Sequence, residues 1–357
     1  MRILLIFSSS QLGGAERSLS RMALNSNNVT YQLATIGEEG PWCEWVRSRG
    51  HDPIVFGNKD GLITFTQNLF KTIINSSFNV VYVCGARASL ILRLIMVFTP
   101  KIKLVHGVRW NPNSKSVLDK CFRLMEIFSQ SMVDYWITNS NIARNTLIER
   151  CYISPKKVSV IHNGIDHLPE NLEKIPNRPL EIITVANLNL RKGYLEYISA
   201  IKYVSEKVPD ARFIIIGRDD MGGRLQHAIT QNGLDNIVKY LGFLEDVSPW
   251  YRRARMFVLP SLWGEGCPTT ILESHAYGLP VVAYSIDGIP EVVSDEIDGI
   301  VVPANDCKAL AKSIVKLLEN PELANKLGEA GRRKIENDFL ISSCVDNHSK
   351  IFRGLDF

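Results

Sequence analysis

The chain has 357 residues, of which 45% are apolar and 22% are charged, and its mean hydropathy is close to zero. These proportions are typical of globular proteins and exclude a disordered or fibrous chain. At roughly 100 to 200 residues per domain, the length predicts two domains, each with its own buried core.

The net charge of +4 is unevenly distributed along the chain. Residues 1–165 contain 19 Lys and Arg against 10 Asp and Glu, which gives +9, and the remaining residues carry −5. This asymmetry predicts that the first half meets a polyanion, either an anionic membrane surface or a phosphorylated ligand. Nucleic acid is disfavoured, because the sequence has no Lys/Arg cluster interleaved with aromatic residues.

The cysteines and the apolar stretches bear on localisation. The seven cysteines are an odd number without metal or redox spacing, which favours a reducing, cytoplasmic compartment. Residues 1–7 resemble a first strand rather than a signal peptide. The apolar stretch 88–98 is interrupted by Arg93 and is well short of the ~20 residues that a membrane span requires, so we expect no transmembrane helix.

Short β-rich runs in the first half alternate with segments long enough to form helices. This alternation predicts a parallel sheet with right-handed crossovers. It breaks at residues 162–166, and the Pro-containing, charged stretch 167–179 is the expected linker. The expected strands are 3–7, 31–36, 80–83, 103–106, 135–138 and 158–161.

The same rhythm returns in the second half and predicts a second parallel sheet. The sequence therefore indicates an α/β protein with two Rossmann-like, doubly wound domains, at residues 1–165 and 166–343. A helix over residues 344–357 follows the last strand, and its packing on the first or the second domain is left open. The expected strands are 181–185, 212–216, 238–241, 256–259, 280–283 and 299–302.

The segment 259–273 carries most of the candidate chemistry. An apolar strand leads into a polar loop, and Pro268 is expected in the first turn of a helix that ends at Gly278. In open α/β sheets ligands bind at such an edge, where the N–H groups of a helix N-terminus suit a phosphate. Glu265 and Glu273 would accept hydrogen bonds from ribose or sugar hydroxyls; the alternative is a solvated loop charge and a charge favoured by the helix dipole.

Glu265 and Glu273, with seven residues between them, resemble the Glu-seven-residue-Glu signature of retaining glycosyltransferases of family 4. The resemblance implies the GT-B fold, two Rossmann-like domains that face each other across a cleft. Nearly the whole chain agrees with the pattern of this family, most clearly residues 135–340. The agreeing segments are the glycine loop 13–16, the interdomain segment 160–166, Lys192-Gly193, and the closing pattern 287–291 with 298–299.

The resemblance also implies a role for individual residues. Glu273 would bind the ribose of a nucleotide sugar, Glu265 its sugar ring, and Lys192 would offset the negative charge of the departing diphosphate. The implied catalytic residues are Glu265, Lys192 and His106. The implied donor-binding residues are Gly13, Gly14, Asn187, Arg191, Phe243, Gly266, Cys267, Pro268, Thr269 and Glu273.

For some of these residues, the sequence also allows a role other than the one that the resemblance implies. The family often has Arg where this chain has Asn187, and Arg191 either replaces that cation or is a solvated surface residue. His106 ends a strand and either contacts the sugar or acceptor or is structural. Phe243 borders the base or belongs to the core, and the pair Gly13 and Gly14 approaches a phosphate or forms a tight turn.

The predicted function is a metal-independent retaining glycosyltransferase. It would move a sugar from a nucleotide donor, UDP-sugar rather than GDP-sugar, to a hydroxyl of a saccharide or lipid-linked saccharide of polysaccharide or cell-envelope biosynthesis. No histidines stand at ligand spacing, so we expect no metal. The alternatives are a sugar-nucleotide epimerase of the same fold and a non-catalytic nucleotide-binding scaffold; an oxidoreductase is disfavoured because the first glycine loop lacks the dinucleotide pattern.

The most apolar part of the first half, within residues 89–136, also contains scattered basic residues. Amphipathic basic helices bind anionic lipid headgroups, so we predict a peripheral protein on the inner face of the plasma membrane. Packing into the core is the alternative explanation. The basic residues counted for this surface are Arg93, Lys101, Lys103, Lys115, Lys120 and Arg123.

Overall fold

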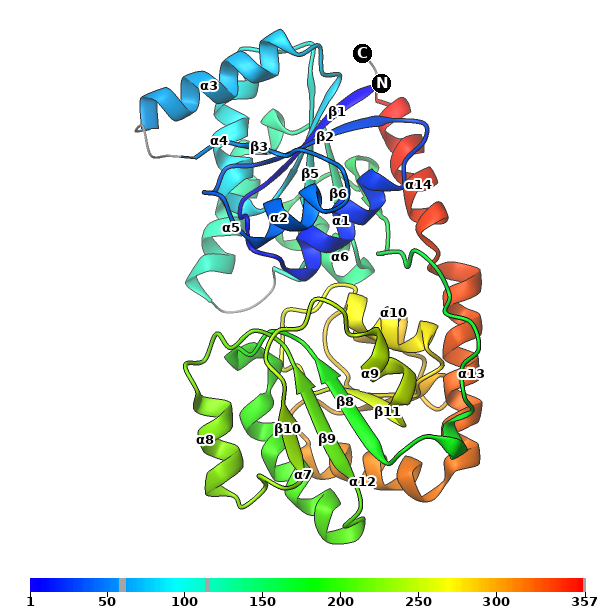
Figure 1. The fold of residues 1–357 in the computed structure, drawn as a ribbon. Helices are drawn as coiled ribbons and strands as arrows, with labels where there is room; N and C mark the ends of the chain where they lie inside the picture. Colours follow the sequence, from blue (N-terminus) through cyan, green and yellow to red (C-terminus); the bar gives the residue numbers. More distant parts are fainter. Residues whose placement is uncertain (58–61, 113–115, 356–357) are drawn as a thin grey trace. The chain divides into compact units, whose positions relative to one another are not determined.

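The structure, a computed structural model, describes residues 1–57, 62–112 and 116–355. The chain divides into two units (Figure 1). Unit 1 comprises residues 1–166 and 341–357, and unit 2 comprises residues 167–340. The division falls one residue after the expected boundary, and the last helix is assigned to unit 1.

Unit 1 contains a seven-stranded parallel sheet in the order β3-β2-β1-β4-β5-β6-β7. The six expected strands are present, and β3, an edge strand of two residues, was not predicted. The chain runs from β1 outward to β3 and then returns to β4, so the order of the strands reverses between β1 and β4. The strands are β1 (Arg2–Phe7), β2 (Thr30–Thr35), β3 (Ile54–Val55), β4 (Val80–Cys84), β5 (Lys103–Val108), β6 (Tyr135–Thr138) and β7 (Val158–Val160).

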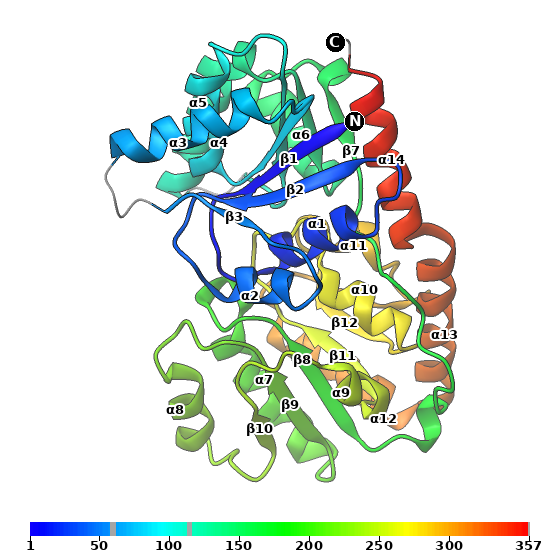
Figure 2. The ribbon, with the colours of Figure 1, turned by 45° about the horizontal axis from the view of Figure 1, so that its top comes forward.

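Helices cover both faces of this sheet (Figure 2). Buried residues of α1, α2 and α14 pack on one face, and those of α3, α4, α5 and α6 pack on the other. The strands are therefore buried on both sides, which explains why they are nearly continuous apolar runs. The helices are α1 (Gly14–Leu24), α2 (Pro41–Arg47), α3 (Leu62–Asn75), α4 (Ala86–Met96), α5 (Val117–Ser129), α6 (Asn141–Cys151) and α14 (Ile341–Arg353), with 3₁₀ turns η1 (Gln130–Met132) and η2 (Pro155–Lys157).

The last helix, α14, packs on unit 1, which answers the question left open by the sequence. Phe352 is fully buried, and its ring lies 5.4 Å from that of Tyr82 on β4. Ile341 begins the helix three residues earlier than expected, and its backbone N–H donates to the carbonyl of Ile165 at 2.9 Å. This hydrogen bond joins the two segments of unit 1, close to where the chain leaves the unit and where it returns.

Unit 2 contains the six predicted strands in a parallel sheet, and their order is β10-β9-β8-β11-β12-β13. Here the strand order reverses between β8 and β11. The strands are β8 (Glu181–Val185), β9 (Arg212–Ile216), β10 (Val238–Tyr240), β11 (Met256–Leu259), β12 (Val281–Tyr284) and β13 (Gly299–Val302). The helices are α7 (Tyr194–Lys207), α8 (Arg224–Gln231), α9 (Ser248–Arg253), α10 (Thr269–Ala276), α11 (Ile289–Val292), α12 (Cys307–Glu319) and α13 (Pro321–Asp338), with 3₁₀ turns η3 (Ile175–Asn177) and η4 (Leu190–Lys192).

Much of the expected linker, residues 167–179, is bound to unit 2. Arg332 donates to the carbonyl of Pro169 at 2.8 Å, and Arg178 donates to that of Tyr277 at 3.2 Å. Ile175 is buried, and its N–H donates to the Asn325 side chain at 3.1 Å. The segment is therefore largely a fixed part of unit 2 rather than a free connection.

Within the described ranges 1–57, 62–112 and 116–355, no helix is both long and apolar enough to cross a membrane.

Candidate functional site

Two loops of unit 2 meet at the carboxyl edge of its sheet, where the strand order reverses. One follows β8 and contains η4, which ends at Lys192; the other, residues 260–268, follows β11 and leads into α10. Gly193 lies between them with φ +65°, and a Cβ at this position would stand 2.1 Å from the carbonyl oxygen of Pro260. Only glycine permits this approach, and the Leu262 N–H then donates to the Arg191 carbonyl at 2.7 Å.

Lys192 and Glu265 form a buried ion pair between these loops. The Ser261 hydroxyl donates to the same carboxylate oxygen of Glu265 at 2.6 Å. Burial by itself would raise the pKa of Glu265, but the Lys192 and Arg191 cations and the two hydrogen bonds hold that pKa below its usual value. Burial lowers the pKa of Lys192, and the Glu265 carboxylate opposes this shift. The structure thus brings together two of the three predicted catalytic residues.

Asp287 shapes the backbone around Glu265. One of its carboxylate oxygens accepts hydrogen bonds from the N–H groups of Gly264 at 2.6 Å and Glu265 at 3.3 Å. The Gly288 N–H returns a hydrogen bond to the Glu265 carbonyl at 3.2 Å. Asp287 was not predicted to have a role, although it begins the closing pattern of the family. Ser261 was not predicted either, although it lies in the segment 259–273 that carries most of the candidate chemistry.

Glu273 lies half-buried on α10, and the Tyr251 hydroxyl donates to it at 3.4 Å. The helix spans Thr269–Ala276, so Pro268 stands just before its first residue rather than inside the first turn. The helix also ends two residues before Gly278, which adopts φ +68°. Pro268 stands outside the helix because its backbone is extended, with φ −65° and ψ 111°, so the helical conformation begins at Thr269.

Most of the other predicted donor-binding residues of unit 2 lie in this pair of loops. Gly266, Cys267 and Pro268 are buried, and Thr269 is half-buried. The Asn187 side chain accepts from the Arg218 N–H at 3.2 Å, and Arg191 donates to the Gly264 carbonyl at 2.9 Å. A cavity of about 540 Å³ beside them is lined by Asn189, Leu190, Arg191, Asp220, Met221, Arg224 and Trp263.

Phe243 and the glycine pair can be placed as well. Phe243 is 48% exposed, so its alternative reading as a core aromatic is wrong. In unit 1, Gly13 precedes α1 and Gly14 begins it, at the carboxyl edge next to β1. A Cβ on Gly13 would stand 2.6 Å from a Glu16 carboxylate oxygen, whereas nothing lies within 4 Å of one on Gly14.

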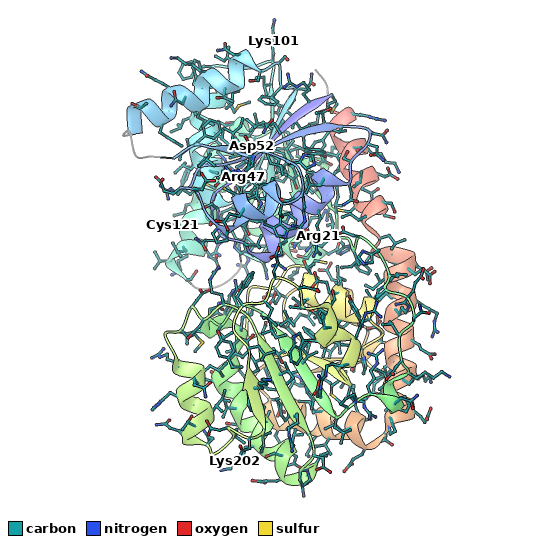
Figure 3. The ribbon with its side chains drawn as sticks, viewed as in Figure 1. Arg21, Arg47, Asp52, Lys101, Cys121 and Lys202 are labelled. Carbon is teal, nitrogen blue, oxygen red and sulfur yellow. The ribbon has the colours of Figure 1, made fainter. Side chains whose placement is uncertain are left out.

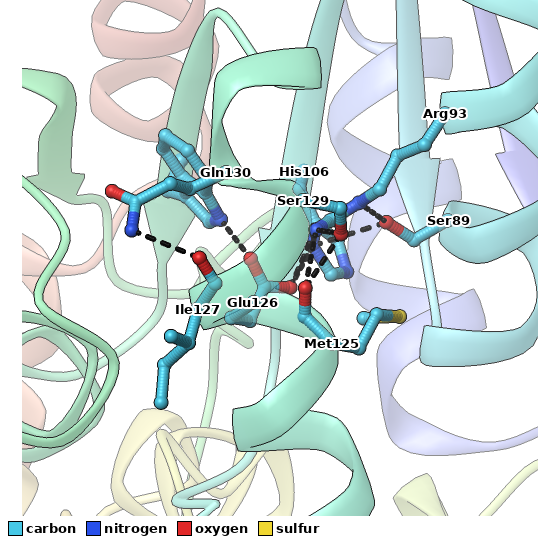
Figure 4. Close-up of polar contacts among 9 residues, drawn as sticks. Ser89, Arg93, His106, Met125, Glu126, Ile127, Ser129 and Gln130 are labelled. Atoms are coloured by element: carbon cyan, nitrogen blue, oxygen red, sulfur yellow. Dashed lines mark hydrogen bonds and ion pairs between the residues drawn. The ribbon is translucent and has the colours of Figure 1, made fainter.

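His106 lies in unit 1, fully buried within a cluster of polar side chains (Figure 4). Its Nδ1 is 2.9 Å from Glu126 Oε1 and 3.1 Å from Arg93 Nη2. Arg93 and Glu126 pair at 2.6 Å, and Trp136 donates to the second carboxylate oxygen at 2.8 Å. The pKa of Glu126 is lowered to about 2, because its interactions with His106 and Arg93 outweigh the opposing effect of burial. His106 Nε2 has no partner among the described residues.

Over the residues that the structure describes, no group of three or more His, Cys, Asp or Glu side chains could hold a metal ion.

Comparison with known families assigns both parts of the chain. Residues 12–167 match the model of Glycosyltransferase Family 4, and residues 170–334 match that of Glycosyl transferases group 1. The first match covers every strand of the unit 1 sheet except β1, and the second covers every strand of the unit 2 sheet. The chain therefore carries two glycosyltransferase domains in succession, the second of which contains Lys192, Glu265 and Glu273.

Individual relatives agree with this assignment. The chain is 26% identical over 302 residues to the UDP-Gal:alpha-D-GlcNAc-diphosphoundecaprenol alpha-1,3-galactosyltransferase of Escherichia coli, a match covering 80% of this chain and 78% of that protein. It is 32% identical over 193 residues to the amylovoran biosynthesis glycosyltransferase AmsK of Erwinia amylovora, covering 52% and 47% of the two chains. It thus spans only about half the length of the second relative.

The solved structure of Anabaena HepE in complex with UDP and glucose resembles this one with a TM-score of 0.87. The match covers 99% of this chain and 100% of HepE at 19% sequence identity. A likeness at this identity establishes the fold, which is GT-B: two parallel-sheet, Rossmann-like domains.

Proposed function

We propose that these two glycosyltransferase domains form a metal-independent retaining enzyme that transfers a sugar from a UDP-sugar to a lipid-linked saccharide. The observation that carries the proposal is the Lys192–Glu265 pair at the carboxyl edge of unit 2, beside the N-terminus of α10. In an open α/β sheet this edge binds ligands where the strand order reverses.

The chemistry of the proposed reaction fits these groups. When a nucleoside diphosphate departs, negative charge develops on its phosphates, and a fixed cation lowers the free energy of that transition state. Lys192 supplies such a charge, and the positive end of the α10 dipole adds to it. Arg191 contributes further positive potential to the same loop. These residues would do the work that a divalent cation performs in other enzymes.

The surroundings of Glu265 favour a front-face mechanism over a covalent one. One oxygen of its carboxylate already accepts from both Lys192 and Ser261, and Asp287 orders its backbone. A carboxylate held in this way is suited to orient sugar hydroxyls rather than to attack the anomeric carbon. Glu273, half-buried on the next helix, is suited to accept hydrogen bonds from ribose hydroxyls.

The proposed donor and acceptor follow the E. coli relative, which uses UDP-Gal and a diphosphoundecaprenol-linked sugar. The UDP and glucose bound to HepE point to the same class of donor. A sugar-nucleotide epimerase would act on the donor without an acceptor. A non-catalytic scaffold would convert neither the donor nor the acceptor.

A surface of unit 1 supports access to a lipid-linked acceptor. The neighbouring helices α4 and α5 and the residues next to them expose several large apolar side chains, and Lys101 and Lys120 are exposed as well. We define the α4–α5 surface by these exposed apolar residues: Leu90, Leu94, Val97, Phe98, Val117, Leu118, Leu124 and Phe128. An apolar surface with basic residues is suited to docking on an anionic bilayer.

Not every basic residue counted from the sequence belongs to this surface. Arg93 is fully buried against Glu126, so its assignment to the membrane surface was wrong. Lys103 is half-buried and pairs with Asp134 at 3.5 Å, and Arg123 donates to the Pro112 carbonyl at 2.5 Å. Lys115 lies outside the described residues. We therefore propose that exposed apolar residues contribute more to membrane binding than was expected from the number of basic residues in the sequence.

The proposal is tested by incubating the protein with UDP-sugars and a prenyl-diphosphate-linked sugar, with and without EDTA. We expect UDP release that depends on the acceptor and persists in EDTA, and an anomeric coupling constant in the product that reports retention. An epimerised donor without acceptor, or a strict requirement for a divalent cation, would refute the corresponding part of the proposal.

A further inference from the structure

Unit 1 contains two strongly buried arginines with different surroundings. Arg93 is fully buried, and Glu126 provides its counter-charge. Arg109, the first residue after β5, is only 9% exposed. Within the described part of the chain, Arg109 forms no ion pair with any carboxylate.

All side-chain partners of Arg109 are electrically neutral. Its Nη2 donates to the Tyr82 hydroxyl at 2.7 Å and lies 3.3 Å from His348 Nε2. Its Nη1 donates to the Asn163 side-chain oxygen at 3.3 Å, and the Ser18 hydroxyl donates to the same oxygen at 2.6 Å. The Arg109 Nε–H is buried and has no partner among the described residues.

Neither Tyr82 nor His348 supplies a compensating negative charge. Burial raises the pKa of the Tyr82 phenol to about 12, so it stays neutral at physiological pH. Burial and the nearby Arg109 cation lower the pKa of His348 to about 3, so the imidazole is neutral as well. His348 Nδ1 lies 2.8 Å from the Cys344 carbonyl, which places its proton there and leaves Nε2 as an acceptor.

Taking a guanidinium out of water without an anion is unfavourable, and removing such a charge often stabilises a protein. Neutral hydrogen bonds recover only part of this cost, and among the described residues the Arg109 Nε–H has no acceptor. The unfavourable free energy of burying this charge remains in the folded protein. A bound anion would compensate for it.

The position of Arg109 agrees with a ligand-binding role. Arg109 follows β5, and its side chain reaches Tyr82 of the adjacent strand β4 and, through Asn163, approaches α1. The strand order of unit 1 reverses between β1 and β4, which is where ligands bind in open α/β sheets. Glu16 on α1 and Arg109 both act electrostatically on the Cys84 thiol, the carboxylate raising its pKa and the guanidinium lowering it.

We propose that Arg109 holds a binding site for an anionic ligand group on unit 1, and that this group is a diphosphate. A guanidinium with an unused N–H matches phosphate oxygens through charge-assisted hydrogen bonds. The anion site itself does not depend on the proposed transfer reaction; the choice of a diphosphate as the ligand rests on that proposed function. The diphosphate belongs either to the nucleotide donor or to the lipid-linked acceptor, and the two sources can be distinguished by experiment.

The test compares the full chain with Arg109→Met, Arg109→Lys and the matched control Arg93→Met. Without ligand, we expect Arg109→Met to raise the unfolding temperature of unit 1, because the uncompensated charge is removed. Arg93→Met should lower it, because Glu126 then loses its counter-charge. If Arg109→Met lowers the unfolding temperature as Arg93→Met does, Arg109 is a structural cation and the proposal is overturned.

Hydrogen–deuterium exchange with inorganic pyrophosphate, UDP or farnesyl diphosphate gives the binding readout for each unit separately. We expect slower exchange over β4 and residues 158–165 in the wild type and Arg109→Lys, and an affinity about tenfold lower or worse in Arg109→Met. Protection by farnesyl diphosphate but not UDP identifies the acceptor; the reverse identifies the donor. If no compound protects unit 1, the anion site does not exist. Lack of UDP protection in unit 2 alone counts against the proposed function and not against this site.

Discussion

Lys192 and Glu265 are 73 residues apart in the chain, yet they form a buried ion pair between two loops of unit 2. The ammonium and the carboxylate determine each other's charge state, because each pKa depends on the partner. A change at either residue therefore affects the chemistry of the site and the stability of the unit together.

Lys192→Ala should lower kcat more than tenfold, because the positive charge near the departing diphosphate is lost. It should also destabilise unit 2, by about 3 to 5 kcal/mol, because Glu265 stays buried without a counter-charge. Steady-state kinetics and chemical denaturation measure the two effects.

Two control variants distinguish the effect of the lost charge on catalysis from its effect on the stability of unit 2. Adding Glu265→Gln to Lys192→Ala should restore part of the stability but not the activity. Lys202 is an exposed lysine on α7 of the same unit (Figure 3), and Lys202→Ala should alter neither quantity. Unchanged kcat in Lys192→Ala would remove this lysine from the reaction.

Glu273→Ala should weaken UDP binding by about 1 to 3 kcal/mol, because the ribose hydroxyls lose a charged acceptor. Isothermal titration calorimetry with UDP measures the change directly. Glu319 is an exposed carboxylate at the end of α12, and Glu319→Ala provides the control. Equal affinity in Glu273→Ala and wild type would place the ribose elsewhere.

His348 should make unit 1 less stable in acid. Its pKa is 6.5 when unfolded and about 3 when folded, so between these values the unfolded chain binds a proton that the folded chain does not. The contribution of His348 is complete above pH 6.5 and is lost as the pH falls towards 3, at about 1.4 kcal/mol per pH unit. Glu126 acts in a lower window, from pH 4.5 to about 2.

Urea denaturation of unit 1 at several pH values between 7 and 4 tests this dependence. His348→Gln should flatten the pH profile, even where it lowers stability at every pH. His51→Gln changes an exposed histidine of the same unit and should leave the slope intact. A wild-type stability that does not change between pH 6 and 4 would contradict the assignment.

The α4–α5 surface should bind anionic vesicles. Leu118 and Phe128 are 82% and 81% exposed, and Leu118→Asp with Phe128→Asp should reduce sedimentation with phosphatidylglycerol vesicles. Lys120→Glu should reduce binding mainly at low salt, because electrostatic attraction falls off within a Debye length of roughly 8 Å at physiological ionic strength. Ile297→Asp, at an exposed apolar residue of unit 2, should have no effect.

The strands could be predicted because each is a nearly continuous apolar run, as a strand with helices on both faces must be. The two-residue strand β3 was missed, since so short a run has no detectable period. Lys192, Glu265 and Glu273 were recognised from a family pattern. Asp287 and Ser261 were not assigned, because a residue that orders a backbone loop has no characteristic spacing.

The sequence by itself determined the two parallel-sheet domains, the approximate position of their boundary and the acidic pair around α10. These depend on local patterns of apolar residues, glycine and proline, which act over a few positions of the chain. Only the tertiary structure decided which charges are paired. It buried Arg93 against Glu126, brought Lys192 to Glu265, and joined Tyr82 to His348 across 266 positions of sequence. Among the residues that the structure describes, it left Arg109 without a carboxylate partner. The reason is that the free energy of a charge depends on burial and on neighbours supplied by distant segments, and neither is encoded in local spacing.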